Sequence, residues 1–193
     1  APKIITLDTE KKSFKREWFE THYIAQPGMN SLSKYLAHEL NIKLENTVTR
    51  YVQENGKWKL YGIQDNLLGC YDWLINAIPS PQLVSLLPAE SSLLKMANTA
   101  SYSPCFSMML CYQSDQTLNF DAAIVRNSPI SWIASNSSKP ERTNKLSLLI
   151  HSDNTWAKEN INKDMAEIEQ QLLMALQNLL NDNMMDPDHI SIH

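Results

Sequence analysis

The sequence predicts an α+β domain in which a mostly antiparallel sheet, a four-stranded meander, packs against one long helix near the C-terminus. Residues 105–151 carry four β runs separated by turn signals, which is the pattern of consecutive antiparallel strands. Residues 163–183 then place apolar side chains at the 3.6-residue period of a helix. A helix with one apolar face needs a sheet to cover, and the meander is the predicted partner. A smaller αβ portion precedes both.

Composition supports a globular protein with a real core. The chain has 193 residues, of which 43% are apolar and 20% charged, so it forms one domain or one and a half. A net charge of −4 and scattered lysines argue against a nucleic-acid surface. No apolar run reaches the roughly 18 to 20 residues of a membrane span.

The three cysteines, Cys70, Cys105 and Cys111, lack metal-ligand spacing and sit among apolar residues. We therefore expect reduced, buried thiols. Together with the composition, this predicts a soluble, cytoplasmic protein.

The first third of the chain begins with a strand-like run over residues 3–7. Pro27-Gly28 marks a turn before an amphipathic helix. Leucines recur every four residues along that helix, at Leu32, Leu36 and Leu40.

Alternating residues then predict short strands. Ile42 and Leu44 alternate with polar neighbours, and residues 48–53 and 57–62 are joined through Asn55-Gly56. Asn-Gly is the strongest local hairpin signal, because both residues tolerate positive φ.

The middle of the chain predicts one buried strand and two helices. Residues 71–77 form a nearly continuous apolar run, which the prolines at 79 and 81 prevent from continuing. Short helices are expected over residues 82–87 and 91–99.

The meander and the long helix follow. The four strands are expected over residues 105–113, 120–126, 130–135 and 146–151, with a polar loop over 136–145. The apolar helix face consists of Met165, Ile168, Leu172, Leu173, Leu176, Leu179 and Leu180.

The residues alone reveal no catalytic constellation. Of the five histidines, only His189 and His193 have helical i, i+4 spacing, and no third ligand lies nearby, so we predict no metal site. His151 ends a predicted core strand, where a hydrogen-bonded structural role is favoured over a catalytic one. No Gly-x-Ser-x-Gly elbow occurs, and a buried Cys105 would be inert. The catalytic residues are therefore unknown.

Two longer patterns do carry a family resemblance. Residues 23–37 read Tyr-x-x-x-Pro-Gly-Met-x-x-Leu-x-x-x-Leu-Ala, followed by Val48-Thr49-Arg50, and residues 72–82 end in Ala-x-Pro-x-x-Gln. This sequence resembles the flavin-containing amine oxidase superfamily, specifically its renalase-like FAD-dependent oxidoreductases. Further matching pieces follow in the family's order at residues 102–105, 121–123, 132–134, 138–140 and 151–156.

One departure from the family is large. The family opens with a strand–GxGxxG–helix unit for the FAD pyrophosphate, whereas the four glycines here are Gly28, Gly56, Gly62 and Gly69. The family's closing Gly-Asp segment is absent too. The chain opens without a methionine and stops at His193, so we expect a middle, substrate-side fragment of a longer enzyme.

The resemblance implies a cofactor and its contacts. FAD would accept a hydride from an amine or a reduced nicotinamide-type small molecule, with O2 regenerating the flavin. Residues 1–85 would be part of the FAD-binding region, and residues 86–193 the substrate side. Val48 matches the strand position that presents its backbone to the adenine. Ala77, Ile78 and Pro79 match the turn beside the flavin, and Gly28 and Met29 match a second turn on the same side.

The wall of the substrate site is expected from aromatic and apolar residues of the meander. The candidates, each of which is also a candidate core residue, are Tyr102, Phe106, Met108, Tyr112 and Trp132. Alternate residues of a strand share a face. We assign the bulkier set, Phe106 to Tyr112 in steps of two, to the ligand, and the set starting at Cys105 to the long helix.

Two other functions are open at this stage. The chain could be a non-catalytic binding or interaction domain descended from the same family, and a flavin-free hydrolase would need a nucleophile that the sequence does not offer. Without the glycine turn, this chain alone is expected to be inactive and to bind FAD weakly or not at all. Its partners would be a small-molecule substrate and the missing N- and C-terminal segments of its own chain, with neither nucleic acid nor membrane. Its oligomeric state is open.

Overall fold

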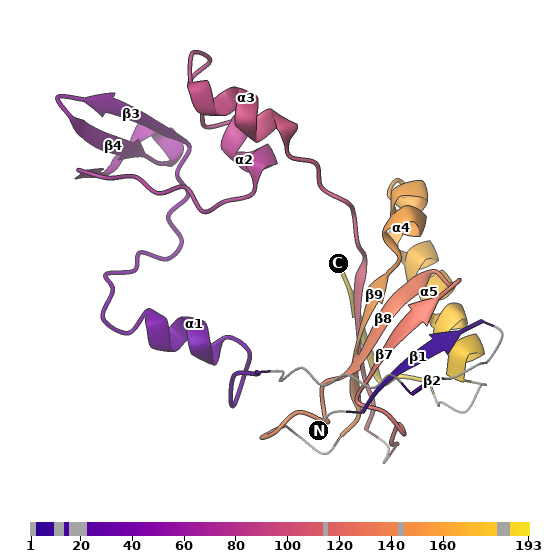
Figure 1. Ribbon diagram of the computed structural model, residues 1–193. Coiled ribbons are helices and arrows are strands. Elements are labelled where there is room, and N and C mark those ends of the chain that lie inside the picture. The colour runs from indigo at the N-terminus through magenta and orange to yellow at the C-terminus, as the bar shows by residue number, and fades with distance from the viewer. Residues whose placement is uncertain (1–2, 10–13, 16–22, 114–115, 143–144, 181–185) are drawn as a thin grey trace. The chain divides into compact units, whose positions relative to one another are not determined.

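The computed structural model describes residues 3–9, 14–15, 23–113, 116–142, 145–180 and 186–193 (Figure 1). The chain divides into two compact units, each described by itself below. The first combines residues 1–36 with residues 103–193, and the second comprises residues 37–102. The boundary expected between residues 85 and 86 falls inside the second unit, between two short helices that pack on each other.

A seven-stranded sheet organises the first unit, with the order β10-β6-β9-β8-β7-β1-β2. The β1·β7 pair is parallel, and every other neighbouring pair is antiparallel. The strands are β1 (Ile4–Asp8), β2 (Phe14–Lys15), β6 (Ser107–Cys111), β7 (Ala122–Arg126), β8 (Ile130–Ser135), β9 (Ser147–Ser152) and β10 (His189–Ile192).

The four strands expected for the meander all form, but only three of them are sequential neighbours. β7, β8 and β9 make a meander, whereas β6 pairs with β9 instead of β7. Backbone hydrogen bonds extend this pairing beyond both ends of β6, from Tyr112 N–H to Leu146 and from Ser152 N–H to Phe106. β10, which was not predicted, pairs with the other edge of β6.

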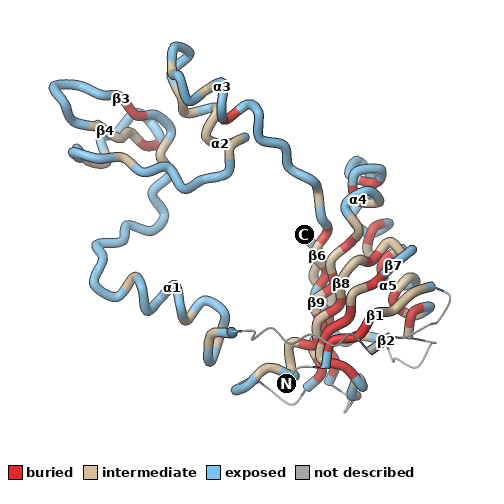
Figure 2. The backbone as a smooth tube through the Cα atoms, viewed as in Figure 1, coloured by how far each residue is buried: buried red, intermediate tan, exposed pale blue. Residues whose placement is uncertain are grey.

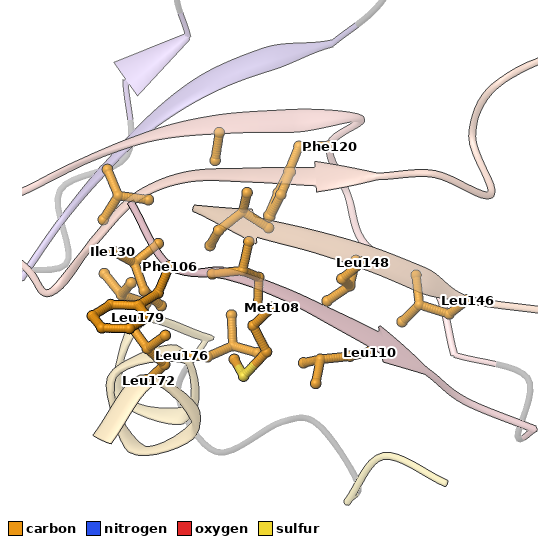
Figure 3. Close-up of a cluster of buried hydrophobic side chains, with 14 of the residues drawn as sticks. Phe106, Met108, Leu110, Phe120, Ile130, Leu146, Leu148, Leu172, Leu176 and Leu179 are labelled. Carbon is orange, nitrogen blue, oxygen red and sulfur yellow. The ribbon is translucent and has the colours of Figure 1, made fainter. Parts of the chain in front are cut away.

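The long C-terminal helix forms as α5 (Met165–Leu180) and covers one face of this sheet. Figure 3 shows its leucines at 172, 176 and 179 beside the side chains of Phe106, Met108 and Ile130. A shorter helix that was not predicted, α4 (Asn154–Asn160), precedes it. Burial is concentrated in the strands of the first unit and in the sheet-facing side of α5 (Figure 2).

The predicted facing of β6 is wrong. Phe106, Met108, Leu110 and Tyr112 are buried in the same core cluster as the α5 leucines (Figure 3). The alternate residues Ser107, Met109 and Cys111 are intermediate or exposed. Large apolar side chains fill the space between a sheet and a helix, where they remove the most apolar area from water. Phe106, Met108 and Tyr112 therefore lie on the helix side of the sheet.

The cysteines also differ from expectation, since Cys70, Cys105 and Cys111 are free but exposed. Cys111 belongs to the β6 set that faces away from α5, so the apolar neighbours in its sequence do not cover it. Apolar neighbours along a strand alternate between faces, and they say little about a thiol on the other face.

A short helix, α1 (Ser31–Leu36), follows the Pro27-Gly28 turn. It is six residues long, none of them buried, and it ends before Leu40.

The second unit contains a three-stranded antiparallel sheet, β3 (Arg50–Glu54), β4 (Lys57–Tyr61) and β5 (Leu67–Tyr71). The Asn55-Gly56 hairpin is confirmed, with φ of 51° and 76° at these two residues. A 3-10 turn, η1 (Ile63–Asp65), connects β4 and β5. Two helices, α2 (Ser80–Val84) and α3 (Ser92–Thr99), pack on each other.

The strand predicted over residues 71–77 is wrong. β5 ends at Tyr71, and Trp73 and Ile75 are 87% and 88% exposed. Asp72 forms an ion pair with Lys57, and no strand pairs with residues 72–77 in the described part of the chain. The apolar run therefore lacks the neighbour that would bury it. No strand forms around Ile42 and Leu44 either.

Within the described ranges, no helix is both long and apolar enough to cross a bilayer.

Candidate functional site

The face of the large sheet that points away from α5 carries a hollow. Ile4, Ala122, Ala134 and Leu149 are paired in register across β1, β7, β8 and β9, so they form one row on this face. The two alanines occupy the centre of the row and the larger side chains its ends. Trp132 lies two residues before Ala134 on the same face of β8. The short alanine side chains leave space between these larger groups.

This space is a pocket of about 530 Å³. Its volume is within the range of small-molecule sites, roughly 300 to 1,000 Å³. The alanine row, Trp132, Ile24 and Pro140 supply its apolar surface. Its polar groups come from Asp121, Ser135, Ser138 and Lys139. We name it the alanine pocket.

The serines of the alanine pocket have hydrogen-bond partners. Ser138 Oγ donates to the Ser135 carbonyl over 2.9 Å, and Ser135 Oγ lies 3.1 Å from Ser137 Oγ. Ser135 N–H donates to the Asp121 carbonyl over 2.8 Å, which joins the end of β8 to the residue before β7.

The two charged groups of the pocket are not paired with each other. One oxygen of the Asp121 carboxylate, Oδ2, accepts a hydrogen bond from the Lys3 backbone N–H at 2.6 Å. The Lys139 ammonium has no ion-pair or hydrogen-bond partner among the described residues. The pocket thus presents one negative and one positive group beside an apolar surface.

The predicted wall residues separate into three places. Trp132 lines the alanine pocket. Phe106, Met108 and Tyr112 lie in the core on the α5 side, where burial raises the pKa of Tyr112 to about 12. Tyr102 belongs to the second unit.

Tyr102 marks a contact with the predicted flavin turn. Its phenol oxygen accepts a hydrogen bond from the Ser80 backbone N–H at 3.1 Å, directly after Pro79. That hydrogen bond from Ser80 lowers the pKa of Tyr102. Tyr102 therefore holds the start of α2.

His151 is half-buried on the same face as Trp132, and the two are cross-strand partners. Its imidazole makes no hydrogen bond within the described residues, so the structural hydrogen bond favoured by the sequence does not form there.

The predicted cofactor residues lie in both units. Ala77, Ile78 and Pro79 form the irregular segment before α2, and Val48 lies two residues before β3. Gly28 and Met29 precede α1 in the first unit, where the Gly28 carbonyl accepts from Ser31 N–H over 2.9 Å.

The Ala77–Pro79 segment is exposed, and part of its backbone has no hydrogen-bond partner among the described residues. All three residues are exposed, and in the described part of the chain the backbone groups of Ala77 and Ile78 make no hydrogen bond. Unbonded N–H and C=O groups of this kind can donate and accept hydrogen bonds with a ligand.

Sequence reasoning gave no role to Asp121, Ala134 or Lys139. These residues stand in or beside the motif pieces at 121–123, 132–134 and 138–140, so the order of those pieces was a usable signal. The missing information was the β7–β8 register, which places Ala122 opposite Ala134.

No protein-family model matches the sequence. Among solved structures, a protein from Exiguobacterium sp. 255-15, provisionally named a protoporphyrinogen oxidase, has a TM-score of 0.68 at 18% identity. Putrescine oxidase bound to putrescine gives 0.69 at 14% identity. Cyclohexylamine oxidase from Brevibacterium oxydans IH-35A gives 0.67 at 15% identity.

Each match covers 86% of this chain but 38% of the oxidase. The chain therefore spans well under half the length of these proteins. At such low identity the similarity shows a shared fold: this chain is folded like one part of these oxidases.

Proposed function

We propose that this chain is the substrate-side portion, with part of the cofactor-binding region, of an FAD-dependent oxidoreductase of the flavin-containing amine oxidase superfamily, in its renalase-like branch. The observation that carries the proposal is the shared fold over 86% of the chain with three oxidases, two of them named for amines. The motif pieces at residues 23–37 and 72–82 support it independently of that fold.

Bound FAD would supply the hydride acceptor, with O2 as the final oxidant, and the chain's own residues would position the reactants. The unbonded backbone groups of Ala77 and Ile78 would border the flavin ring, and the backbone of Val48 the adenine. Trp132 and the alanine pocket would orient the substrate, an amine or a reduced nicotinamide-type molecule, and exclude water from it.

The rest of the site would come from further segments of the same chain. We propose that these segments lie N- and C-terminal to residues 1–193 and include the strand–GxGxxG–helix unit that binds the FAD pyrophosphate. A cytoplasmic location is part of the same proposal.

A non-catalytic binding domain of the same descent is the second candidate. The observation that favours it is the absence of a G-x-G pair among the four glycines of the sequence. Such a domain would keep the alanine pocket but would hold no flavin.

Flavin content of the natural protein decides between the two. The full-length protein purified from its source should carry stoichiometric FAD and consume O2 when given its amine or nicotinamide substrate. The 193-residue chain alone should bind FAD weakly or not at all in a fluorescence titration. A flavin-free natural protein with no upstream GxGxxG unit would support the binding domain. Submicromolar FAD affinity of the short chain would contradict the fragment proposal.

Val48 and Val52 provide a matched pair for the adenine contact. In the full-length protein, Val48→Asp should lower FAD retention more than Val52→Asp, because Val48 alone matches the adenine-facing position. Melting temperatures measured alongside would separate flavin loss from unfolding, and equal flavin loss at equal stability would remove the assignment.

A further inference from the structure

The alanine pocket combines three features that specify a ligand. Its centre is apolar and hollow because Ala122 and Ala134 are small. The indole of Trp132 provides a flat surface beside it. One carboxylate, Asp121, and one ammonium, Lys139, line the same space without forming an ion pair.

Two unpaired opposite charges favour a ligand that carries both signs. A cationic amine would be attracted to Asp121 but repelled by Lys139. An organic anion would be attracted to Lys139 but repelled by Asp121. Such interactions are stronger beside apolar walls than in bulk water, because the effective dielectric constant is lower there. A ligand with both an ammonium and a carboxylate pairs with both groups and leaves neither uncompensated.

We propose that the alanine pocket binds a small zwitterion with an apolar or aromatic body, that is, an α-amino acid or a close relative. Its ammonium would face Asp121, and its carboxylate would face Lys139. Its body would lie over Ala122 and Ala134 against the ring of Trp132. Taking this ligand as the substrate of the oxidoreductase rests on the proposed function; its binding to the pocket does not.

Three probes of nearly equal size test the charge requirement on the 193-residue chain. L-Phenylalanine carries both charges, phenylethylamine only the ammonium, and phenylpropanoate only the carboxylate. Isothermal titration calorimetry should give L-phenylalanine the highest affinity, about tenfold or more above each of the others, which corresponds to one additional charge pair of ordinary strength.

Single substitutions assign the two ends. Lys139→Gln should reduce the affinity for L-phenylalanine to that for phenylethylamine and leave phenylethylamine binding no weaker. Asp121→Asn should reduce it to that for phenylpropanoate, while its amide oxygen can still accept from Lys3 N–H. Ala134→Leu should abolish binding of all three probes by filling the hollow. Lys158→Gln, at an exposed position of α4 outside the pocket, is the charge-matched control and should change nothing.

Equal affinity for the three probes, or no saturable binding of L-phenylalanine to a chain whose melting curve is intact, would overturn the inference. The assay contains no flavin, so its failure is separate from that of the proposed function. A flavin-loaded natural protein whose pocket ignores L-phenylalanine would overturn this inference alone. Selective binding by a flavin-free natural protein would uphold the pocket and remove only its role in oxidation.

Discussion

Met108 and Met109 are chemically identical neighbours in β6 with opposite surroundings. Met108 is fully buried between the sheet and α5, and Met109 is 39% exposed on the other face. Comparing substitutions at these two residues therefore tests which face of the sheet α5 covers.

Met108→Ala should lower the free energy of unfolding by about 2–5 kcal/mol, the usual range for removing a large side chain from a core. Met109→Ala should change it by roughly 0.5 kcal/mol or less, as surface substitutions do. Urea denaturation of both variants checks this, and a larger loss for Met109→Ala would put α5 on the wrong face.

Because Tyr112 is buried in this core, the stability of the protein should change with pH in the alkaline range. Burial raises its pKa from 10.0 to about 12, and the Asp186 carboxylate acts in the same direction. Because the pKa is higher in the folded state, the contribution of Tyr112 is complete below pH 10 and is lost as the pH rises toward 12.

Tyr112→Phe should therefore lose less stability than the wild type between pH 10.0 and about pH 12 in urea titrations. Tyr35→Phe, a change to an exposed ring, is the control and should follow the wild type. Parallel losses in all three proteins would contradict the role of Tyr112.

Among the elements, α4 shows how a local cap serves the core. The Asp153 carboxylate accepts hydrogen bonds from Thr155 N–H and Trp156 N–H, at 2.9 and 3.0 Å. The helix that it starts places Trp156 edge-on to Phe106, with ring centroids 6.0 Å apart.

Asp153→Ala should lower the free energy of unfolding by about 1 kcal/mol, within the 0.5–2 kcal/mol typical of N-caps. Asn154→Ala, at the exposed first residue of α4, should have little effect. Chemical denaturation followed by tryptophan fluorescence would report both the stability and the setting of Trp156. An Asn154→Ala effect as large as that of Asp153→Ala would show that the cap is not the cause.

How much of each element could be predicted depended on whether its signal was local. The Asn55-Gly56 hairpin and α5 were predictable, since turn chemistry and a long 3.6-residue period act within the segment itself. The position of β6 was not, because its neighbours β9 and β10 lie far along the chain. The failed strand at 71–77 had the composition of a strand but no partner.

The candidate site divides in the same way. Trp132 was identifiable as a large residue of a sheet, and it lines the pocket. Asp121 and Lys139 required the strand register, and the hydrogen bond from Ser80 to Tyr102 spans 22 positions that include both α2 and α3. The face of β6 that contacts α5 was predicted incorrectly because both alternating sets of side chains are largely apolar. Only the packing of the larger side chains under α5 decides which set is buried.

At the scale of the whole molecule, the two units differ sharply in how much they bury. The core cluster belongs to the first unit, whereas Tyr51 and Ala97 are the buried apolar residues described in the second. The Tyr51 hydroxyl is buried and has no hydrogen-bond partner within the described ranges, which weakens the second unit further.

Hydrogen exchange measured by mass spectrometry should therefore show strong protection in β6, β8 and β9 and much faster exchange in β3, β4 and β5. Segments with few buried contacts open at a small free energy, well below that of global unfolding. If the proposed function is correct, protection of the second unit should rise in the FAD-loaded full-length protein. Equal protection of both sheets in the short chain would contradict this difference.

The parallel pairing of β1 with β7 also limits how early in synthesis β1 can join the large sheet. Lys3 and Asp121, which are hydrogen-bonded at the start of that pair, stand 118 positions apart. Closing a chain of that length costs about 4 kcal/mol in the logarithmic term alone. The entire second unit is synthesised in the interval, and β6 gains its outer neighbour β10 only when residues 189–192 emerge. β1 can thus take its place in the sheet only after β7 has been synthesised, and pairing over so long a stretch of chain slows the folding of the large sheet.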